Sequence, residues 1–309
     1  MNKLLAAMDG LEASFTRWAE ARDDIRAAVV VGSRARLDHP ADAWADLDVG
    51  IATTEPGRYH EDTAWLSEIA PVWTMYRDPG GATYHVLFDG GLDAGIAVLP
   101  VRAFAFAARM APVLNSRVVQ EMPLIGKALR QQLNSGADYY GPGCRVLFDK
   151  DGAATRFLQA FPAGARKTRA LPSRKEFGSA TNEFWFNAVW TAKHLERGEL
   201  WFARTAGCEG SLRGRLLEMI EWHALAFHRL DYNTWERGRF MEEWADPRVV
   251  AELREIVTGY DRSSIRMTLH GTLALYRWLT SETAEQLGYG YSNTLPENVT
   301  LWIDRNISD

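Results

Sequence analysis

The sequence predicts an α+β fold, with an N-terminal core of mixed β-sheet over residues 1–150 and a C-terminal all-helical bundle over residues 151–309. Short runs of apolar and β-branched residues, bounded by Gly, Pro and Asp, recur as far as residue 149 and are typical of strands. From about residue 151 onward, apolar residues recur at helical spacing instead. A chain of 309 residues is also long enough for two domains, each with its own core.

The elements of the N-terminal part follow from these patterns. An amphipathic helix is expected over residues 2–22, and further helical segments near 61–70 and 101–110. Strands are expected over residues 27–31, 46–53, 72–77, 83–88, 92–99 and 144–149. The turn sequence Asp89-Gly90-Gly91 predicts that the fourth and fifth strands form an antiparallel hairpin.

The C-terminal part is expected to consist of long helices over residues 175–197, 211–229, 247–259 and 262–280. Four aromatic residues lie close together on the first of these helices: Phe184, Trp185, Phe186 and Trp190. Such a group could line a cleft, but aromatic residues at helical spacing more often form core, which is the interpretation we favour.

Composition limits the class of protein. Lys and Arg number 35 against 40 for Asp and Glu, which argues against a nucleic-acid partner and favours a cationic small molecule. The only cysteines, Cys144 and Cys208, are too few for a disulfide framework and indicate a reducing compartment. No apolar run approaches the length of a membrane-spanning helix. We therefore expect a cytoplasmic protein with no membrane partner.

The strongest chemical signal is a Gly-Ser turn followed by paired carboxylates. Gly32 and Ser33 come directly after a buried strand, and Asp46-Leu47-Asp48 opens the next one. Side chains two residues apart on a strand share a face, so Asp46 and Asp48 should stand together with Leu47 turned into the core. Paired carboxylates repel each other unless a cation lies between them, and Mg²⁺ prefers such oxygen ligands. Glycine allows close approach of a ligand, while the serine hydroxyl and nearby amides can donate to phosphate, so we expect phosphoryl or nucleotidyl chemistry.

A third acid, Asp93, lies at the start of a later predicted strand. An Asp-x-Asp sequence alone is common and is usually a solvated turn. In this order, however, the Gly-Ser pair, the Asp-x-Asp and the third acid resemble the nucleotidyltransferase superfamily with a polymerase-beta-like core.

Further segments narrow the resemblance to the aminoglycoside 6-adenylyltransferases, also called streptomycin adenylyltransferases. The resembling segments span most of the chain: residues 32–34, 46–48, 86–93, 145–152, 182–186, 192–200, 219–223 and 238–240. Two places depart from the usual pattern. The third acid lies in Asp93-Ala94-Gly95-Ile96, where a bulkier Asp-Leu-Thr-Leu-like run is usual, and His194 replaces a usual glycine.

This resemblance implies a Mg²⁺-dependent enzyme that transfers AMP from ATP to a hydroxyl of an aminoglycoside such as streptomycin, releases pyrophosphate and so inactivates the antibiotic. Asp46 and Asp48 would hold the metal. Asp93 would act as the base that deprotonates the acceptor hydroxyl, as a further metal ligand, or as both. The resemblance assigns nucleotide binding to Gly32, Ser33, Arg34 and Lys193.

Two groups of residues on the C-terminal helices have a competing structural interpretation. Lys193 could reach the triphosphate, or it could belong to a solvated face on which Glu196 and Glu199 are available as partners. Three residues lie on one helical face and could receive a cationic acceptor: Glu218, Glu221 and Trp222. They could equally be surface acids beside a core tryptophan.

Alternative functions remain open at this point. The chain could transfer nucleotides to another small molecule or to a protein or RNA hydroxyl, or it could be an inactive nucleotide-binding relative. The presence of all three acids argues against lost activity, and the charge balance argues against RNA.

Overall fold

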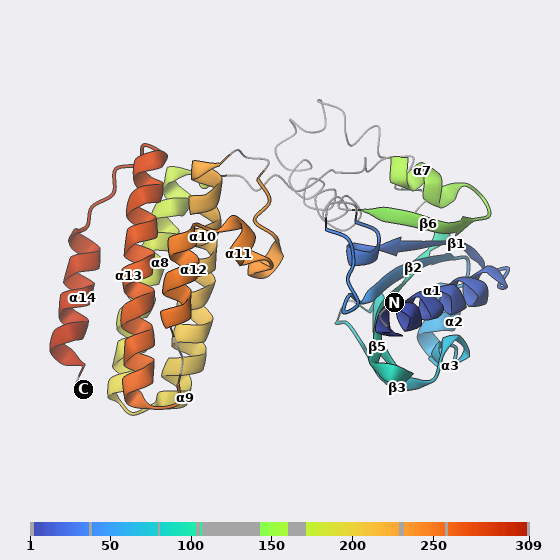
Figure 1. Ribbon diagram of the computed structural model, residues 1–309, viewed down its shortest axis with the longest axis horizontal. Coiled ribbons are helices and arrows are strands. Elements are labelled where there is room, and N and C mark those ends of the chain that lie inside the picture. The colour runs from blue at the N-terminus through green and yellow to red at the C-terminus, as the bar shows by residue number, and fades with distance from the viewer. Residues whose placement is uncertain are drawn as a thin grey trace. The chain divides into compact units, whose positions relative to one another are not determined.

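The computed structural model in Figure 1 describes residues 3–36, 39–79, 81–102, 106, 143–159, 171–228, 232–256 and 259–307. The chain forms two compact units, Met1–Lys167 and Thr168–Asp309. Helix α7 (Ala153–Gln159) packs against strands of the first unit and belongs to it, so the division falls after α7, whereas the sequence placed it near residue 150.

The first unit is built on a six-stranded mixed sheet with the order β3-β4-β5-β2-β1-β6. Its strands are β1 (Ile25–Val31), β2 (Leu47–Thr53), β3 (Val72–Arg77), β4 (Thr83–Phe88), β5 (Leu92–Pro100) and β6 (Cys144–Asp149). Strands β2 and β5 pair in parallel, and every other neighbouring pair is antiparallel. The six predicted strands and the β4–β5 hairpin are therefore confirmed. The helix predicted over residues 101–110 lies largely outside the described residues.

One face of this sheet is covered by α1 (Lys3–Glu20), with α2 (Pro56–Glu61) and α3 (Leu66–Ile69) beside it (Figure 1). Alternate residues of β4, namely Tyr84, Val86 and Phe88, are buried on this side. Trp18 of α1 stacks on Trp65 with ring centroids 5.0 Å apart. Because burial of a large apolar side chain contributes roughly 1.5–3 kcal/mol, this aromatic layer fixes the sheet against α1.

The opposite face has a smaller apolar cluster at the β1 and β6 side of the sheet. Ala27, Val29 and Val31 of β1 are buried there together with Ala154 of α7. The same face of the sheet continues across β2, β5, β4 and β3, and it carries the acidic residues considered below.

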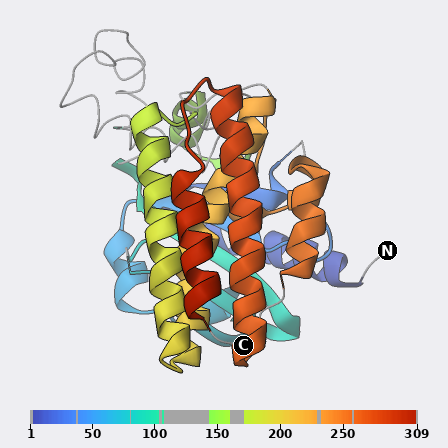
Figure 2. The same ribbon diagram turned by 90° about the vertical axis from the view of Figure 1, so that its left-hand side faces the viewer.

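The second unit is helical: α8 (Arg174–Glu196), α9 (Leu200–Phe202), a π-helical segment η3 (Ala203–Leu212), α10 (Arg213–Phe227), α11 (Met241–Trp244), α12 (Pro247–Glu255), α13 (Arg262–Gln286) and α14 (Thr294–Asn306). Helices α13 and α14 run alongside α8 (Figure 2). A capping box, in which Ser173 and Glu176 bond each other's backbone N–H groups, starts α8. The predicted all-helical character is confirmed, although α11, α14 and the segment around α9 were not predicted.

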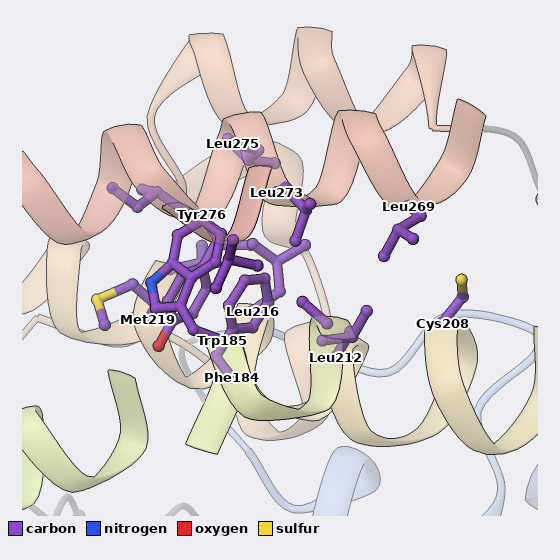
Figure 3. Packing of buried hydrophobic residues seen from close by; sticks show 14 of the residues in the cluster. Phe184, Trp185, Cys208, Leu212, Leu216, Met219, Leu269, Leu273, Leu275 and Tyr276 are labelled. Carbon is purple, nitrogen blue, oxygen red and sulfur yellow. The ribbon is translucent and has the colours of Figure 1, made fainter. Parts of the chain in front are cut away.

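The core of the second unit centres on aromatic side chains of α8 and α13. Phe184 and Tyr276 stack with ring centroids 3.5 Å apart, and Trp185 is fully buried beside them (Figure 3). Phe186, by contrast, is 72 % exposed, and Trp190 is half-buried. The prediction that this aromatic group forms core therefore holds for Phe184 and Trp185 and is wrong for Phe186, which lies on the outer side of the helix.

Both cysteines are free thiols. Desolvation raises the pKa of Cys144, on β6, to about 12, and it also raises the pKa of Cys208, in η3, to about 12. None of the helices in the described ranges has a stretch that is long and apolar enough to cross a membrane.

Candidate active site

The parallel pairing of β2 with β5 brings three acids to one edge of the sheet. Leu47 is in register with Ala94, and Asp48 is in register with Gly95. Asp46 immediately precedes Leu47 and Asp93 immediately precedes Ala94, so these two acids are neighbours. Desolvation raises the pKa of Asp93 above its ordinary value, and the negative charge of Asp46 adds to the increase. The structure thus brings Asp46, Asp48 and Asp93 together.

Leu47 is 1 % exposed, which confirms that it turns into the core while its two acidic neighbours face the other way. The carboxylate of Asp48 occupies space that two glycines leave free. A Cβ atom at Gly95 would lie 2.5 Å from Asp48 Oδ1, and a Cβ atom at Gly32 would lie 2.5 Å from Asp48 Oδ2. Both glycines are therefore needed for Asp48 to hold this position.

The Gly-Ser turn lies directly beside these acids. Strand β1 ends at Val31, opposite Asp48, and Gly32–Arg34 then form a short 3₁₀ turn. Gly32 has a φ of +69°, which favours glycine. The Ser33 hydroxyl donates to Asp46 Oδ1 over 3.5 Å, a long bond that a phosphate oxygen could readily replace.

Arg34 extends away from this turn toward α1. Its guanidinium forms an ion pair with Asp9, and Arg34 Nε lies 3.6 Å from Glu12 Oε2. Arg145 of β6 bonds the same Glu12 over 2.7 Å. This network ties the turn to α1 and β6 and compensates the charge of Arg34, so nucleotide binding by its side chain stays a prediction.

The donor chemistry at this sheet edge fits a magnesium ion that is shared with a nucleotide. Within the described ranges, no three His, Cys, Asp or Glu side chains form a preassembled metal cluster. Mg²⁺ usually takes only one or two protein carboxylates and completes its shell with water and substrate phosphates. Asp46 and Asp48 could supply these carboxylates, with the Gly32–Ser33 turn beside them for phosphate.

Lys193 lies in the second unit, at a cavity of about 590 Å³ that α8 and α14 line. Its ammonium lies 5.8 Å from the centroid of the Trp302 ring. The two acids that were considered as its partners are engaged elsewhere, Glu196 with Arg262 and Glu199 with His194. Among the ion pairs of the described residues, none involves Lys193, which leaves its charge available to an anionic ligand.

Glu218 and Glu221 line one cavity of about 470 Å³ at the start of α10. Glu218 is already paired, since Arg215 donates to it over 2.6 Å and to Glu183 over 2.6 Å. Trp222 instead packs against the hydrophobic core and lies 6.2 Å from the ring of Phe177. The structure therefore brings the two glutamates together, while Trp222 takes the core position of the alternative interpretation.

Sequence reasoning did not recognise Gly95 as part of the site. A glycine inside a strand often marks a close approach of another group, and here that group is the carboxylate of Asp48. The unusual Ala94-Gly95 pair after Asp93 was the signal that could have identified it.

A mixed sheet that carries a Gly-Ser turn beside acids on two parallel strands is the arrangement expected of a nucleotidyltransferase. The sequence model of the family described as streptomycin adenylyltransferase matches residues 10–89 and 122–306. This chain therefore belongs to the streptomycin adenylyltransferase family. The strand that carries Asp93 lies between the two matched ranges.

Related proteins named aminoglycoside 6-adenylyltransferase cover most of the chain. The protein from Bacillus subtilis is 22% identical over 91% of this chain and 90% of its own length. The protein from Campylobacter jejuni is 21% identical over 86% of this chain and 84% of its own length. The protein from Staphylococcus aureus is 20% identical over 94% of this chain and 95% of its own length. A crystal structure of an aminoglycoside 6-adenyltransferase from Bacillus subtilis aligns with 100% of both chains at 17% identity, with a TM-score of 0.42.

Proposed function

We propose that this protein transfers AMP from ATP to a hydroxyl group of an aminoglycoside and releases pyrophosphate. The observation that carries the proposal is the grouping of Asp46, Asp48 and Asp93 beside the Gly32–Ser33 turn. The names of the three relatives, which span nearly the whole chain, support an aminoglycoside as the acceptor.

In this mechanism the Gly32–Ser33 turn binds the phosphates, through its backbone N–H groups and the Ser33 hydroxyl. The acceptor oxygen forms a bond to the α-phosphorus while the bond from that phosphorus to pyrophosphate breaks. Asp93 takes the proton of the acceptor hydroxyl. Desolvation and the neighbouring charge of Asp46 raise the pKa of Asp93, which makes it a stronger base than an ordinary aspartate.

Asp46 and Asp48 are the residues that we propose as ligands of Mg²⁺. When bound, the ion supplies positive charge to the triphosphate and stabilises the charge that develops on transfer. Lys193 is the further cation that we propose for the phosphates; its lack of a carboxylate partner among the described residues supports this role.

Streptomycin is the acceptor that we propose first. It carries two guanidinium groups, whose burial requires acidic partners because their lost solvation is costly. Glu221 and Glu218 line a cavity of suitable charge, although a ligand would have to compete with Arg215 for Glu218.

The decisive experiment incubates the protein with ATP, Mg²⁺ and a panel of aminoglycosides, and follows each drug by mass spectrometry. The expected result is a gain of one AMP on streptomycin, together with release of pyrophosphate. Omission of Mg²⁺ should stop the reaction. If ATP is hydrolysed to AMP and pyrophosphate but no aminoglycoside gains mass, water has replaced the acceptor, and the acceptor is a hydroxyl compound outside the panel. If ATP binds without any turnover, the protein is an inactive relative.

A further inference from the structure

Four residues form a straight row across the face of the sheet that carries the three acids. Tyr76 of β3 is in register with His85 of β4, His85 with Gly95 of β5, and Gly95 with Asp48 of β2. Directly paired residues on neighbouring strands point to the same side of a sheet. Tyr76, His85 and Asp48 therefore share one face, and Gly95 adds no side chain between His85 and Asp48.

The two aromatic members of this row form a preassembled stack. The rings of Tyr76 and His85 lie 4.6 Å apart at an interplanar angle of 12°. Tyr76 is 64 % exposed and His85 is half-buried, so the stack projects from the sheet and part of it is accessible to a ligand. Strands are about 4.8 Å apart, which puts His85 about 10 Å from Asp48 across the bare backbone of Gly95.

The strand order indicates from which side of the sheet the acceptor approaches the proposed nucleotide site. The phosphate-binding turn follows β1, the proposed metal ligands lie at β2, Asp93 lies on β5, and the ring stack lies on β4 and β3. In an in-line displacement the attacking oxygen enters opposite to the leaving pyrophosphate. An acceptor that gives its proton to Asp93 therefore approaches from the side of β4 and β3.

We propose that the Tyr76–His85 stack is the acceptor subsite, and that it binds a saturated ring carrying cationic groups by packing against that ring's face. The inference rests on the proposed function and adds a subsite on the sheet, near Asp93, to the acidic partners proposed above for the guanidinium groups of the acceptor. Aromatic faces attract ammonium and guanidinium groups, and the carboxylate of Asp93 lies diagonally from His85 on the next strand.

The nearest cation on β3 does not interfere with such a ligand. Arg77 is in register with Tyr84, and its guanidinium lies 5.3 Å from the centroid of the Tyr84 ring. Tyr84 is buried in the core on the opposite face of the sheet. Among the described residues of β3, the one cation thus lies on the opposite face of the sheet, and the stack presents aromatic rings near the acids Asp48 and Asp93, a combination that favours a cationic ring over an anionic one.

The test compares His85→Ala and Tyr76→Ala with the ring-retaining variants His85→Phe and Tyr76→Phe. Trp201→Ala is the matched control, because Trp201 is 65 % exposed and lies in the second unit. Each alanine variant should raise KM for the aminoglycoside by about 2- to 30-fold, the range of a cation–π contact. KM for ATP should stay within about twofold in every variant, and the control should keep the wild-type acceptor KM. Each phenylalanine variant should raise the acceptor KM less than the corresponding alanine variant does, because it keeps an aromatic face.

Other outcomes separate the subsite from the proposed function. An unchanged acceptor KM in both alanine variants overturns the subsite, as does an equal rise in KM for ATP. If the wild-type protein adenylylates no aminoglycoside, the proposed function fails by itself. The subsite is then tested by titrating streptomycin while the imidazole Cε1–H resonance of His85 is followed by NMR. A saturable shift that Tyr76→Ala weakens supports the subsite, and no shift overturns it.

Discussion

Replacement of Gly95 by alanine tests how tightly the site depends on the position of Asp48. The new methyl carbon would lie 2.5 Å from Asp48 Oδ1, whereas ordinary van der Waals contact begins near 3.4 Å. The carboxylate oxygen must therefore move by about 0.9 Å, the difference between these two distances. Gly95 does not have a positive φ, so the alanine backbone itself is not strained.

The effect should appear in activity far more than in stability. Misplacement of a catalytic group by about 1 Å can cost on the order of 100-fold in rate, so kcat/KM of Gly95→Ala should fall by roughly that factor. The displaced side chain costs about 0.5–1.5 kcal/mol if it leaves its rotamer. Reduced freedom of the unfolded chain offsets this by about 0.4–1 kcal/mol, so Tm should change by only a few degrees.

Gly50→Ala is the matched control, because Gly50 lies on β2 two residues after Asp48 and on the same face of the sheet. A Cβ atom at Gly50 would meet Val29 Cγ2 at 3.5 Å, an ordinary contact, and should leave kcat/KM near that of the wild type. Initial rates of pyrophosphate release, together with thermal unfolding of all three proteins, provide the comparison. A Gly95→Ala protein with wild-type kcat/KM would show that Asp48 need not be where the structure places it.

Three further predictions concern the acids themselves. Asp93→Asn should lower kcat at least about 100-fold but change Mg-ATP affinity little by calorimetry. Because the pKa of Asp93 is raised and the base must be ionised, kcat/KM of the wild type should fall with decreasing pH at a midpoint above the ordinary aspartate pKa of about 3.9. This fall at low pH should vanish in Asp93→Asn. If the variant retains it, the titrating group is another residue. Asp48→Asn should abolish transfer while leaving the metal-free protein equally or slightly more stable, because one of two repelling charges is gone; retained turnover would contradict its assignment as a metal ligand. The double change Glu218→Gln and Glu221→Gln should raise KM for streptomycin, leave KM for ATP nearly unchanged, and matter less at high salt; equal effects on both substrates would place these acids outside an acceptor site.

The fold was largely predictable because each strand carries its own pattern. Strand β4 alternates half-buried and buried residues, and the Asp89–Gly91 turn after it leaves little freedom in pairing with β5. The segment from Leu200 to Leu212 was less predictable. A Cβ atom at Gly207 would lie 2.5 Å from Thr191 Cγ2, so close packing against α8 accompanies this π-helical stretch, and no local periodicity encodes that contact.

For the site, the sequence identified candidate residues but not which of them lie close together in space. Asp46, Asp48 and Asp93 were recognised by spacing, but their proximity depends on the parallel β2–β5 pairing, which only tertiary structure specifies. Arg34 was assigned to the nucleotide because the family resemblance includes it with Gly32 and Ser33, yet its side chain forms ion pairs with acids on α1. Tyr76 and His85 belong to no motif, since only the sheet register brings their rings together.

The two native thiols make this protein convenient for site-specific chemistry. A thiol whose pKa is about 12 is almost entirely protonated at neutral pH, and only the thiolate reacts rapidly with alkylating reagents. Cys144 and Cys208 should therefore remain unlabelled under mild conditions while the protein is folded. One cysteine introduced at an exposed position outside the proposed subsite, such as Trp201, could then carry a fluorophore without prior removal of the native residues. A dye at this position would report on its local surroundings as nucleotide or acceptor is added.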